Sequence, residues 1–263
     1  FWWESVEFFL MKMIFYFFPV SHSIIQGMAL GMDTPAGRML HTGDFKLDPS
    51  SPSWSTDIEA YRSFSKNGLT LLMSDSTNVE KEGFSVSESM VVNALEDLLA
   101  QAKGRVIVTL FSSNIQRIQN VMNVASQTGR SVLVEGRSLV NNIEMARELG
   151  ILHPPTGLYL DPSEAPPLAD SEIVLLVTGS QGEPLSALSR IAAGEHRHLA
   201  VHEGDTVIMS SRSIPGNSRA VTKLIDKLYR QGAEVFYENL ADVHASGHAY
   251  KEELRILFKA TKP

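Results

Sequence analysis

Residues that can bind a metal ion lie at the ends of strand-like runs in separate parts of the chain. His22 and Asp44, twenty-two residues apart, each stand at the end of an apolar run, and His244 and His248 follow the run 234–238. Neutral imidazole and carboxylate oxygen are usual Zn²⁺ ligands, and a carboxylate can bridge two ions. Because the chain has no cysteine, any metal site must use such ligands. The pattern indicates a metallohydrolase centre built from separate segments.

Spacing alone also permits a structural role for these residues. His22 could pack or hydrogen-bond in a loop, and Asp44 could close a Gly-Asp turn. His41 is expected further down the same strand as a packed or hydrogen-bonded histidine. Lys46 is expected either to contact phosphate or to be a solvated lysine.

Several other segments strengthen the functional interpretation, because they match segments of a known family in the same order. They are Met73-Ser-Asp75-Ser-Thr-Asn78, Leu110-Phe-Ser-Ser-Asn114, Val134-Glu-Gly-Arg137-Ser, Thr178-Gly-Ser-Gln-Gly-Glu183-Pro and Ser211-Arg-Ser-Ile-Pro-Gly-Asn217. From about Phe17 onward, the chain resembles the β-CASP nucleases of the ribonuclease J type, in the metallo-β-lactamase superfamily. It departs from the family at Ile25-Gln26, where Pro-Asp is usual, and it lacks the family's His-x-His-x-Asp-His cluster and a further ligand histidine.

The resemblance implies a zinc-dependent ribonuclease with two Zn²⁺ ions in the intact parent. His22 matches a ligand of one ion, and Asp44 matches the bridging carboxylate. His248 matches the histidine that protonates the leaving group, and Asp75 the carboxylate that orients it. The parent would hydrolyse RNA phosphodiesters as an endonuclease and a 5′–3′ exonuclease, in RNA processing and decay. Two remaining ligands cannot complete a tetrahedral site, so this chain is expected to be an inactive fragment that binds zinc weakly.

A hydroxyl-rich turn between a strand and a helix is expected to bind single-stranded RNA. Turn amides can hold phosphate and an aromatic ring can stack a base, although a core phenylalanine and turn-capping side chains are equally open alternatives. The predicted substrate-binding residues are Phe111, Ser112, Ser113, Asn114, Arg117, Gly179, Ser180, His244 and Ser246.

From residue 105 onward, short apolar runs alternate with helix-length segments, which is typical of a parallel sheet covered on both faces. We therefore expect an α/β fold: a partial metallo-β-lactamase αββα sandwich with an inserted β-CASP parallel-sheet α/β domain. The expected bounds are 1–85 for the first metallo-β-lactamase segment, 86–243 for the β-CASP domain and 244–263 for the return. Strand-like pieces are expected through 28–75, and a surface connection at 153–167. A helix is expected from 90 to 100, capped by Ser87 or, as the competing position, by Ser89.

Composition sets limits on the partners. The formal net charge of −7 argues against a broad electrostatic grip on nucleic acid, so RNA should be held locally. The aromatic-rich first twenty residues are interrupted by Glu4, Glu7 and Lys12, so we expect no membrane segment or signal peptide. The chain begins with Phe and looks like a fragment of a cytoplasmic protein, and the sequence leaves a homo-oligomeric parent open.

Two alternatives remain, of which the first comes from another class of protein. The chain could be a non-catalytic nucleic-acid or nucleotide-binding module, which the missing ligands favour. It could also belong to a β-CASP nuclease that processes DNA or messenger-RNA 3′ ends. The retained Asp44, Asp75 and His248 favour a catalytic ancestry.

Overall fold

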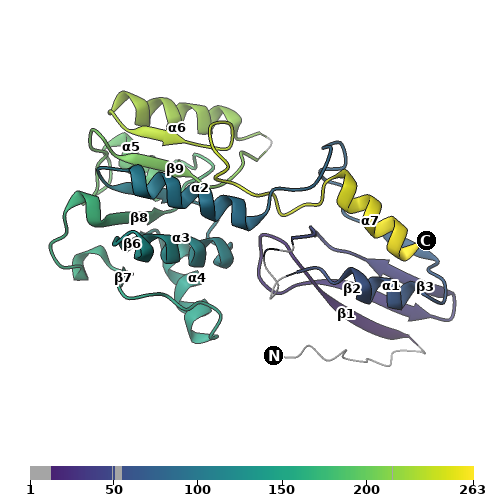
Figure 1. The fold of residues 1–263 in the computed structure, drawn as a ribbon. Coiled ribbons are helices and arrows are strands. Elements are labelled where there is room, and N and C mark those ends of the chain that lie inside the picture. Colours follow the sequence, from purple (N-terminus) through teal and green to yellow (C-terminus); the bar gives the residue numbers. More distant parts are fainter. Residues whose placement is uncertain (1–12, 49, 51–54, 215) are drawn as a thin grey trace. The chain divides into compact units, whose positions relative to one another are not determined.

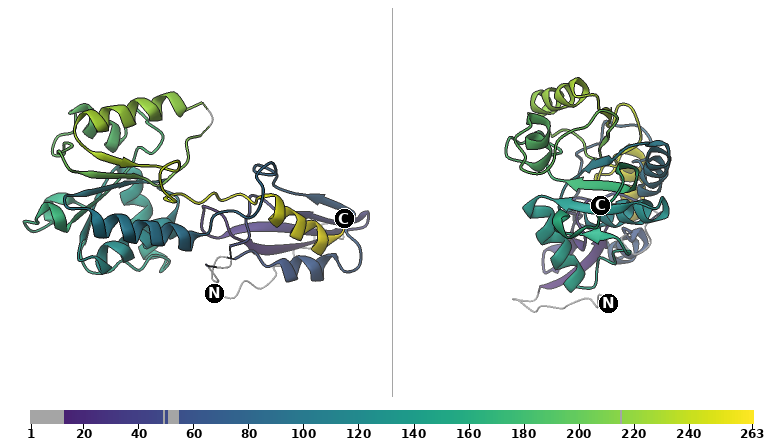
Figure 2. Two further views of the ribbon diagram at one scale, coloured as in Figure 1. Left: turned by 45° about the horizontal axis from the view of Figure 1, so that its top comes forward. Right: turned by 90° about the vertical axis from the view of Figure 1, so that its left-hand side faces the viewer.

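The computed structural model describes residues 13–48, 50, 55–214 and 216–263, and these form two compact units. Unit 1 runs to Ser87 and resumes at Ser246, and unit 2 comprises Glu88–Ala245 (Figures 1 and 2). These bounds differ by two residues from the expected domain bounds. The aromatic residues 1–12 lie outside the described part. Within that part, no helix has the length and apolar character needed to cross a bilayer.

Unit 1 contains a four-stranded sheet in the order β1-β2-β3-β4. Its strands are β1 (Ile14–Val20), β2 (Gly27–Thr34), β3 (Gly37–His41) and β4 (Leu71–Met73). The first three pair antiparallel, and β4 pairs parallel to β3. The predicted apolar run 14–20 is therefore a strand, and it delivers His22 at its carboxyl end.

Two helices, α1 (Ile58–Ser65) and α7 (Lys251–Thr261), pack on one face of this sheet. Tyr61 and Leu257, both fully buried, join the core formed by alternate strand residues. The core leaves no room at Gly31, where an added Cβ would lie 2.9 Å from Phe18 and from Phe64. The expectation of strand-like pieces throughout 28–75 was wrong for α1. Its N-cap, Asp57, accepts a hydrogen bond from the backbone N–H of Ala60, which starts a helix in a segment without a strand partner.

Unit 2 contains a six-stranded sheet in the order β10-β9-β5-β8-β6-β7, and every pairing is parallel. The strands are β5 (Val106–Thr109), β6 (Ser131–Glu135), β7 (Leu158–Tyr159), β8 (Ile173–Val177), β9 (Thr206–Met209) and β10 (Glu234–Phe236). Two of them, β5 and β9, are buried along their whole length. The predicted parallel α/β sheet is confirmed.

Helices cover both faces of the unit 2 sheet (Figure 1). They are α2 (Glu88–Gln101), α3 (Ile115–Gln127), α4 (Arg137–Glu148), α5 (Ala187–Ala193) and α6 (Ser218–Arg230). Leu188 of α5 and Leu228 of α6 share one apolar core with alternate strand residues such as Ile107. The side chains between those alternate residues point to the opposite face, which α2, α3 and α4 cover. Helix α2 begins directly after Ser87.

The Pro-rich stretch 153–167 is more than a surface connection. It contributes β7, which pairs with β6 at the sheet edge, and a 3-10 turn at Pro162–Glu164. The two-residue strand is too short to give an alternating sequence pattern, so the sequence could not reveal it.

Candidate metal centre and substrate-binding turns

Three of the predicted site residues in unit 1 meet at one point. One ligand atom each from His22, Asp44 and His248 lie within 4.8 Å of one another. His22 Nε2 lies 3.8 Å from Asp44 Oδ2, and the two imidazole centroids are 5.0 Å apart. The spacing suits a shared cation, because side chains at these separations need only small shifts to reach metal–ligand lengths of about 2.0–2.2 Å.

Hydrogen bonds orient both imidazoles toward that point. His22 Nδ1 lies 2.8 Å from the carbonyl oxygen of Gly247, and His248 Nδ1 lies 2.8 Å from Asp75 Oδ2. Because a carbonyl or an ionised carboxylate can only accept, Nδ1 carries the proton in each ring and donates it. When the ring is neutral, each Nε2 presents a lone pair, which is the arrangement that histidine ligands adopt in metal sites. These donors fit a zinc ion, although the Ser23 hydroxyl also lies 3.2 Å from His22 Nε2.

Asp75 and His248 form a strongly coupled pair. Burial by itself would raise the pKa of Asp75, but hydrogen bonds from His248 and Thr77, together with the charge of His248, lower it to about 2. The same hydrogen bond from Asp75 raises the pKa of His248 above its ordinary value, against the opposing effect of burial. The Asp75 side chain is 3% exposed and that of His248 is 26% exposed. The pair therefore favours a proton on the imidazole, held by an ionised carboxylate.

Short bonds between neighbouring residues hold the site segments together. The Lys46 N–H donates to the Ser21 carbonyl at 2.9 Å, which joins the segments of Asp44 and His22. The Ala249 N–H donates to the Phe45 carbonyl at 2.7 Å and joins the segments of His248 and Asp44. The backbone thus sets the positions of the site residues, and their side chains need little reorganisation.

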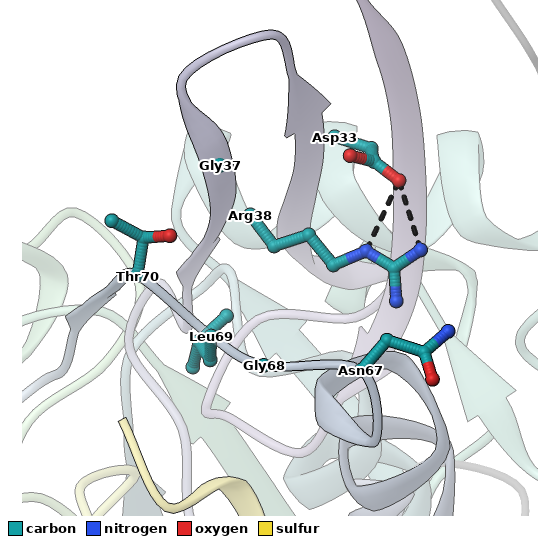
Figure 3. A pocket seen from close by; sticks show the side chains of 7 residues that line it. All are labelled: Asp33, Gly37, Arg38, Asn67, Gly68, Leu69 and Thr70. Atoms are coloured by element: carbon teal, nitrogen blue, oxygen red, sulfur yellow. Dashed lines mark hydrogen bonds and ion pairs between the residues drawn. The ribbon is translucent and has the colours of Figure 1, made fainter.

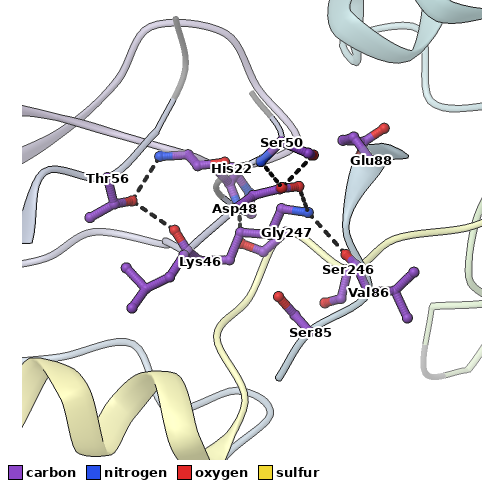
Figure 4. Close-up of polar contacts among 12 residues, drawn as sticks. His22, Lys46, Asp48, Ser50, Thr56, Ser85, Val86, Glu88, Ser246 and Gly247 are labelled. Atoms are coloured by element: carbon purple, nitrogen blue, oxygen red, sulfur yellow. Dashed lines mark hydrogen bonds and ion pairs between the residues drawn. The ribbon is translucent and has the colours of Figure 1, made fainter. Parts of the chain in front are cut away.

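Lys46 fits neither role expected for it. Its side chain is buried, and its ammonium group lies 2.8 Å from Asp48 Oδ2 and 3.2 Å from the Val86 carbonyl. Its own carbonyl accepts from the Thr56 hydroxyl at 2.7 Å, and Figure 4 shows these groups together. A lysine engaged in this way braces the loop after Asp44 and does not contact a substrate phosphate. His41 is exposed, and its Nδ1 accepts from the Gly43 N–H at 3.0 Å.

In unit 2, the predicted binding turns follow two adjacent strands, β5 and β8. Helix α3 after β5 and helix α5 after β8 lie on opposite faces of the sheet (Figure 1). This is a topological switch point, where ligands bind to parallel α/β sheets beyond the strand ends. Phe111 and Ser112 are partly exposed and Ser113 is exposed, whereas Gly179 and Ser180 are buried. The turn after β5 can therefore contact a ligand through the ring of Phe111 and the serine hydroxyls. The turn after β8 can contact one through its backbone amides.

Arg117 was predicted to contact substrate, and the structure contradicts this. Its side chain is 0% exposed, and its guanidinium donates to both carboxylate oxygens of Glu88, at 2.8 and 2.7 Å. The same group donates to the Ser210 hydroxyl and the Val243 carbonyl. Asn114 is buried, and its side-chain oxygen accepts from the Arg117 N–H as the cap of α3. Arg117 is a structural residue because its donors are already used inside unit 2.

Ser246 and His244 were also predicted to contact substrate. The Ser246 hydroxyl accepts from Asn78 Nδ2 at 2.8 Å and from the His248 N–H at 3.2 Å, so it forms a turn within unit 1. His244 is partly buried and lies in unit 2. Neither arrangement tests a contact with phosphate, which stays a prediction for both residues.

Two pockets open on unit 1. One, of about 440 Å³, is lined by Asp75 together with residues of β4 and α7. The other, of about 350 Å³, lies beside the β2–β3 hairpin (Figure 3). In the second, Arg38 donates to Asp33 at 3.0 and 2.9 Å and to the Phe64 carbonyl at 2.9 Å. That guanidinium is fully engaged, and no predicted site residue lines the pocket, so it has no part in the candidate centre.

Sequence reasoning missed Glu253, a fully buried carboxylate of α7. Its Oε2 accepts from the Tyr250 N–H, as the N3 glutamate of a capping box does. The usual sequence signature has Ser, Thr, Asp or Asn at the N-cap. Because the N-cap here is a tyrosine, the capping box could not be recognised from the sequence.

Comparisons with known proteins agree with the fold and the motifs. The family model described as the β-CASP domain of ribonuclease J matches residues 103–228. Ribonuclease J of Helicobacter pylori (strain 26695) is 40% identical over 245 residues, which covers 93% of this chain and 36% of that protein. Ribonuclease J of Mycobacterium tuberculosis (strain H37Rv) is 43% identical over 248 residues, covering 94% of this chain and 44% of that protein. The chain thus spans less than half the length of these relatives.

One solved structure shows the same fold over nearly the whole chain. A protein of unknown function from Enterococcus faecalis V583 superposes with a TM-score of 0.70 at 17% identity. The match covers 99% of this chain and 59% of that one. At this identity the likeness shows a shared fold and says nothing about function.

Proposed function

Because this chain belongs to the ribonuclease J family of β-CASP proteins, we propose that it supplies part of the catalytic and RNA-binding region of a zinc-dependent ribonuclease. The observation that carries the proposal is the convergence of His22, Asp44 and His248 within 4.8 Å, with Asp75 hydrogen-bonded behind His248. These residues come from separate segments, and a purely structural role would not require one ligand atom of each to lie so close to the other two.

In the proposed site, His22 Nε2 and the Asp44 carboxylate would hold zinc. The ion, when bound, supplies Lewis-acid activation of water and neutralises phosphate charge. The Asp44 carboxylate can move to bind an ion, because its side chain is 61% exposed. The His22 side chain is 14% exposed and is held in place by its hydrogen bond to the Gly247 carbonyl. The chain's described residues provide three candidate ligand atoms, which is fewer than a two-ion site needs.

His248 is proposed to protonate the leaving oxygen of the cleaved phosphodiester. An alkoxide leaves poorly without a proton donor, and general-acid catalysis contributes about 10²–10⁴-fold in rate. Asp75 holds the Nδ1 proton, so that Nε2–H of the protonated ring would be the donor. The raised pKa of His248 supports this role because it increases the protonated fraction near neutral pH.

His248 also belongs to the three-residue cluster, and its Nε2 cannot bind zinc and donate a proton at once. The pH dependence of zinc affinity separates the two roles. A ligand His248 would make affinity rise steeply as pH increases through its pKa, because the proton must leave first. A proton donor His248 can be replaced by glutamine with little effect on affinity, and that is the result we expect.

The partner is proposed to be single-stranded RNA, with Phe111, Ser112 and Ser113 at the switch point of unit 2 as contacts. By relationship to ribonuclease J, the longer protein would act as an endonuclease and a 5′–3′ exonuclease in the cytoplasm. The acidic total charge supports a locally held strand.

The decisive experiment uses the longer protein with an RNA carrying a 5′-monophosphate. We expect zinc-dependent cleavage that is lost when Asp44 is replaced by asparagine, and cleavage unaffected by chelators would exclude the proposal. A second candidate, RNA binding without catalysis, applies to the 263-residue chain alone and is favoured by its small ligand set. For that chain we expect RNA binding, weak zinc binding and no measurable cleavage.

A further inference from the structure

We propose that Glu253 is a positioning residue, which sets the placement of the Asp44 and His248 segments relative to each other. The inference rests on the proposed function of those two residues. It begins from the burial of Glu253, whose side chain has no exposed surface. A buried carboxylate loses its hydration and is tolerated only where hydrogen bonds replace the lost water.

Four hydrogen bonds reach this carboxylate from three segments of unit 1. Oε1 accepts from the Leu47 N–H at 2.7 Å and from the Ser85 hydroxyl at 3.0 Å. Oε2 accepts from the Ser85 N–H at 2.7 Å and from the Tyr250 N–H at 2.8 Å. No cation pairs with Glu253 in the described part of the chain. Its charge is balanced by these donors and by the N-terminus of α7.

A capping role would explain only one of the four bonds. The cap of α7 needs the bond to Tyr250, which a solvent-exposed glutamate could make equally well. The other three go to residues outside the helix, and the bonded segments are those of the candidate site. Leu47 follows Asp44 by three residues, Tyr250 follows His248 by two, and Ser85 lies on the segment after Asp75.

The neighbouring Glu252 provides a matched control. It lies on the same turn of α7, is 34% exposed and pairs with Arg255 of the same helix. Replacing either residue by glutamine removes the same charge from the same helix end. Only the change at Glu253 turns an acceptor oxygen into an NH₂ group that faces backbone N–H donors.

The experiment compares the 263-residue chain with its E253Q and E252Q variants, all labelled with ¹⁵N at histidine. Long-range ¹⁵N–¹H spectra report whether Nδ1 is protonated in His22 and His248, and a zinc titration reports affinity. In E253Q, we expect cooperative unfolding to persist, the His248 signals to shift or broaden, and zinc affinity to fall about tenfold or more. E252Q should match the wild type in all three readouts.

Folded E253Q protein with unchanged imidazole signals would overturn the proposal. If E253Q does not fold, S85A takes its place, because it removes a single hydroxyl donor from the carboxylate. It should shift the same His248 signals to a smaller extent, and unchanged signals would again overturn the proposal. A wild-type chain that binds no zinc would count against the metal site, whereas the imidazole signals would still decide the role of Glu253.

Discussion

His22 Nδ1 and the carbonyl oxygen of Gly247 lie 2.8 Å apart across 225 residues of sequence. The contact is so close that a Cβ added to Gly247 would lie 2.4 Å from His22 Nδ1 and 2.9 Å from the Ser23 nitrogen. A residue with a side chain would therefore clash with His22 at this position, and glycine avoids the clash. This gives the Ser-Gly turn before His248 a direct effect on the orientation of the other imidazole.

Replacing Gly247 with alanine should displace His22 and lower zinc affinity about tenfold or more, because the added methyl group occupies the position of the ring. Overpacking should also cost about 1–3 kcal/mol of unfolding free energy. Calorimetric zinc titration and urea unfolding measure the two effects. Gly31→Ala is the control, since it overpacks against Phe18 and Phe64 in the same unit. The control should lower the free energy of unfolding and leave the ¹⁵N–¹H NMR signals of the His22 imidazole unchanged. Equal effects of the two variants on those signals would contradict this role of Gly247.

Zinc binding to the 263-residue chain should be weak and substoichiometric, because three candidate ligand atoms leave a tetrahedral shell incomplete. His22→Ala and Asp44→Ala should each remove the binding that remains. Equilibrium dialysis provides the measurement. His41→Ala is the matched control, since His41 is an exposed histidine on β3 outside the cluster. Tight retention of two ions would show that the ligand set has been misidentified.

Asp75→Asn should destabilise the metal-free chain most at mildly acidic pH. The lowered pKa of Asp75, about 2, gives stability that is present above its ordinary value of about 3.9 and is lost as pH falls through 2. The raised pKa of His248 gives stability that is present below about 6.5 and is lost as pH rises through its folded value.

The stability difference between wild type and Asp75→Asn should therefore be largest between about pH 4 and 6.5, at about 1.5–3 kcal/mol. Urea unfolding in the presence of chelator at pH 5 and pH 9 tests this. Glu59→Gln serves as the control, because Glu59 and Arg62 form an exposed pair on α1. A difference that grows on going from pH 5 to pH 9 would contradict the assigned charges.

Arg117→Met should destabilise unit 2 by about 3–5 kcal/mol, because it removes the guanidinium that pairs with the Glu88 carboxylate inside unit 2. Thermal or urea unfolding measures the loss. Arg137→Ala, at an exposed position that begins α4, should change stability by less than about 0.5 kcal/mol. If Arg117→Met instead left stability intact and weakened RNA binding, the original substrate-binding prediction would have been right.

Phe111→Ala should weaken binding of a 5′-monophosphorylated oligonucleotide by about 1–3 kcal/mol if the ring stacks a base. Ser113→Ala should weaken it less, through loss of one hydroxyl contact. Fluorescence anisotropy at two salt concentrations gives the affinities, and the salt dependence should be shallow. Tyr229→Ala is the control, since it removes a half-exposed aromatic ring from α6 in the same unit. Equal losses of affinity for the Phe111 and Tyr229 variants would show that the RNA does not bind at the switch point.

The parts of the fold that the sequence predicted are those with a simple periodic pattern. The short, fully apolar runs that became β5 and β9 and their helix-length connections identified the parallel sheet. By contrast, the burial of Arg117 depends on Glu88, which lies 29 residues earlier, and no local pattern reveals that pairing. Lys46 presents the same difficulty, since charged side chains are expected at the surface unless a partner is known.

Candidate site residues were predicted by type and order, whereas their orientation required coordinates. The sequence brought His22 and His248 to attention, but it could not show that both rings donate from Nδ1. Glu253 carried only a weak signal, because the N-cap residue of α7 is Tyr250 and not the Ser or Thr of the usual capping-box pattern.

The hydrogen bond between His248 and Asp75 closes a chain loop of 173 residues, which contains all of unit 2. The entropic cost of closing a flexible loop rises only slowly with length, by about 0.6 kcal/mol per doubling, so equilibrium stability is little affected. Folding kinetics are affected more, because contacts between distant residues form slowly. The strands of the unit 2 sheet all lie before residue 246, so this sheet can form before those residues are in place, although β5 pairs with β8 and β9 and not with β6, the next strand in sequence. Residues 246–250 must then contact segments of unit 1 that were synthesised much earlier, so the cluster of His22, Asp44 and His248 should acquire its native order after the unit 2 sheet.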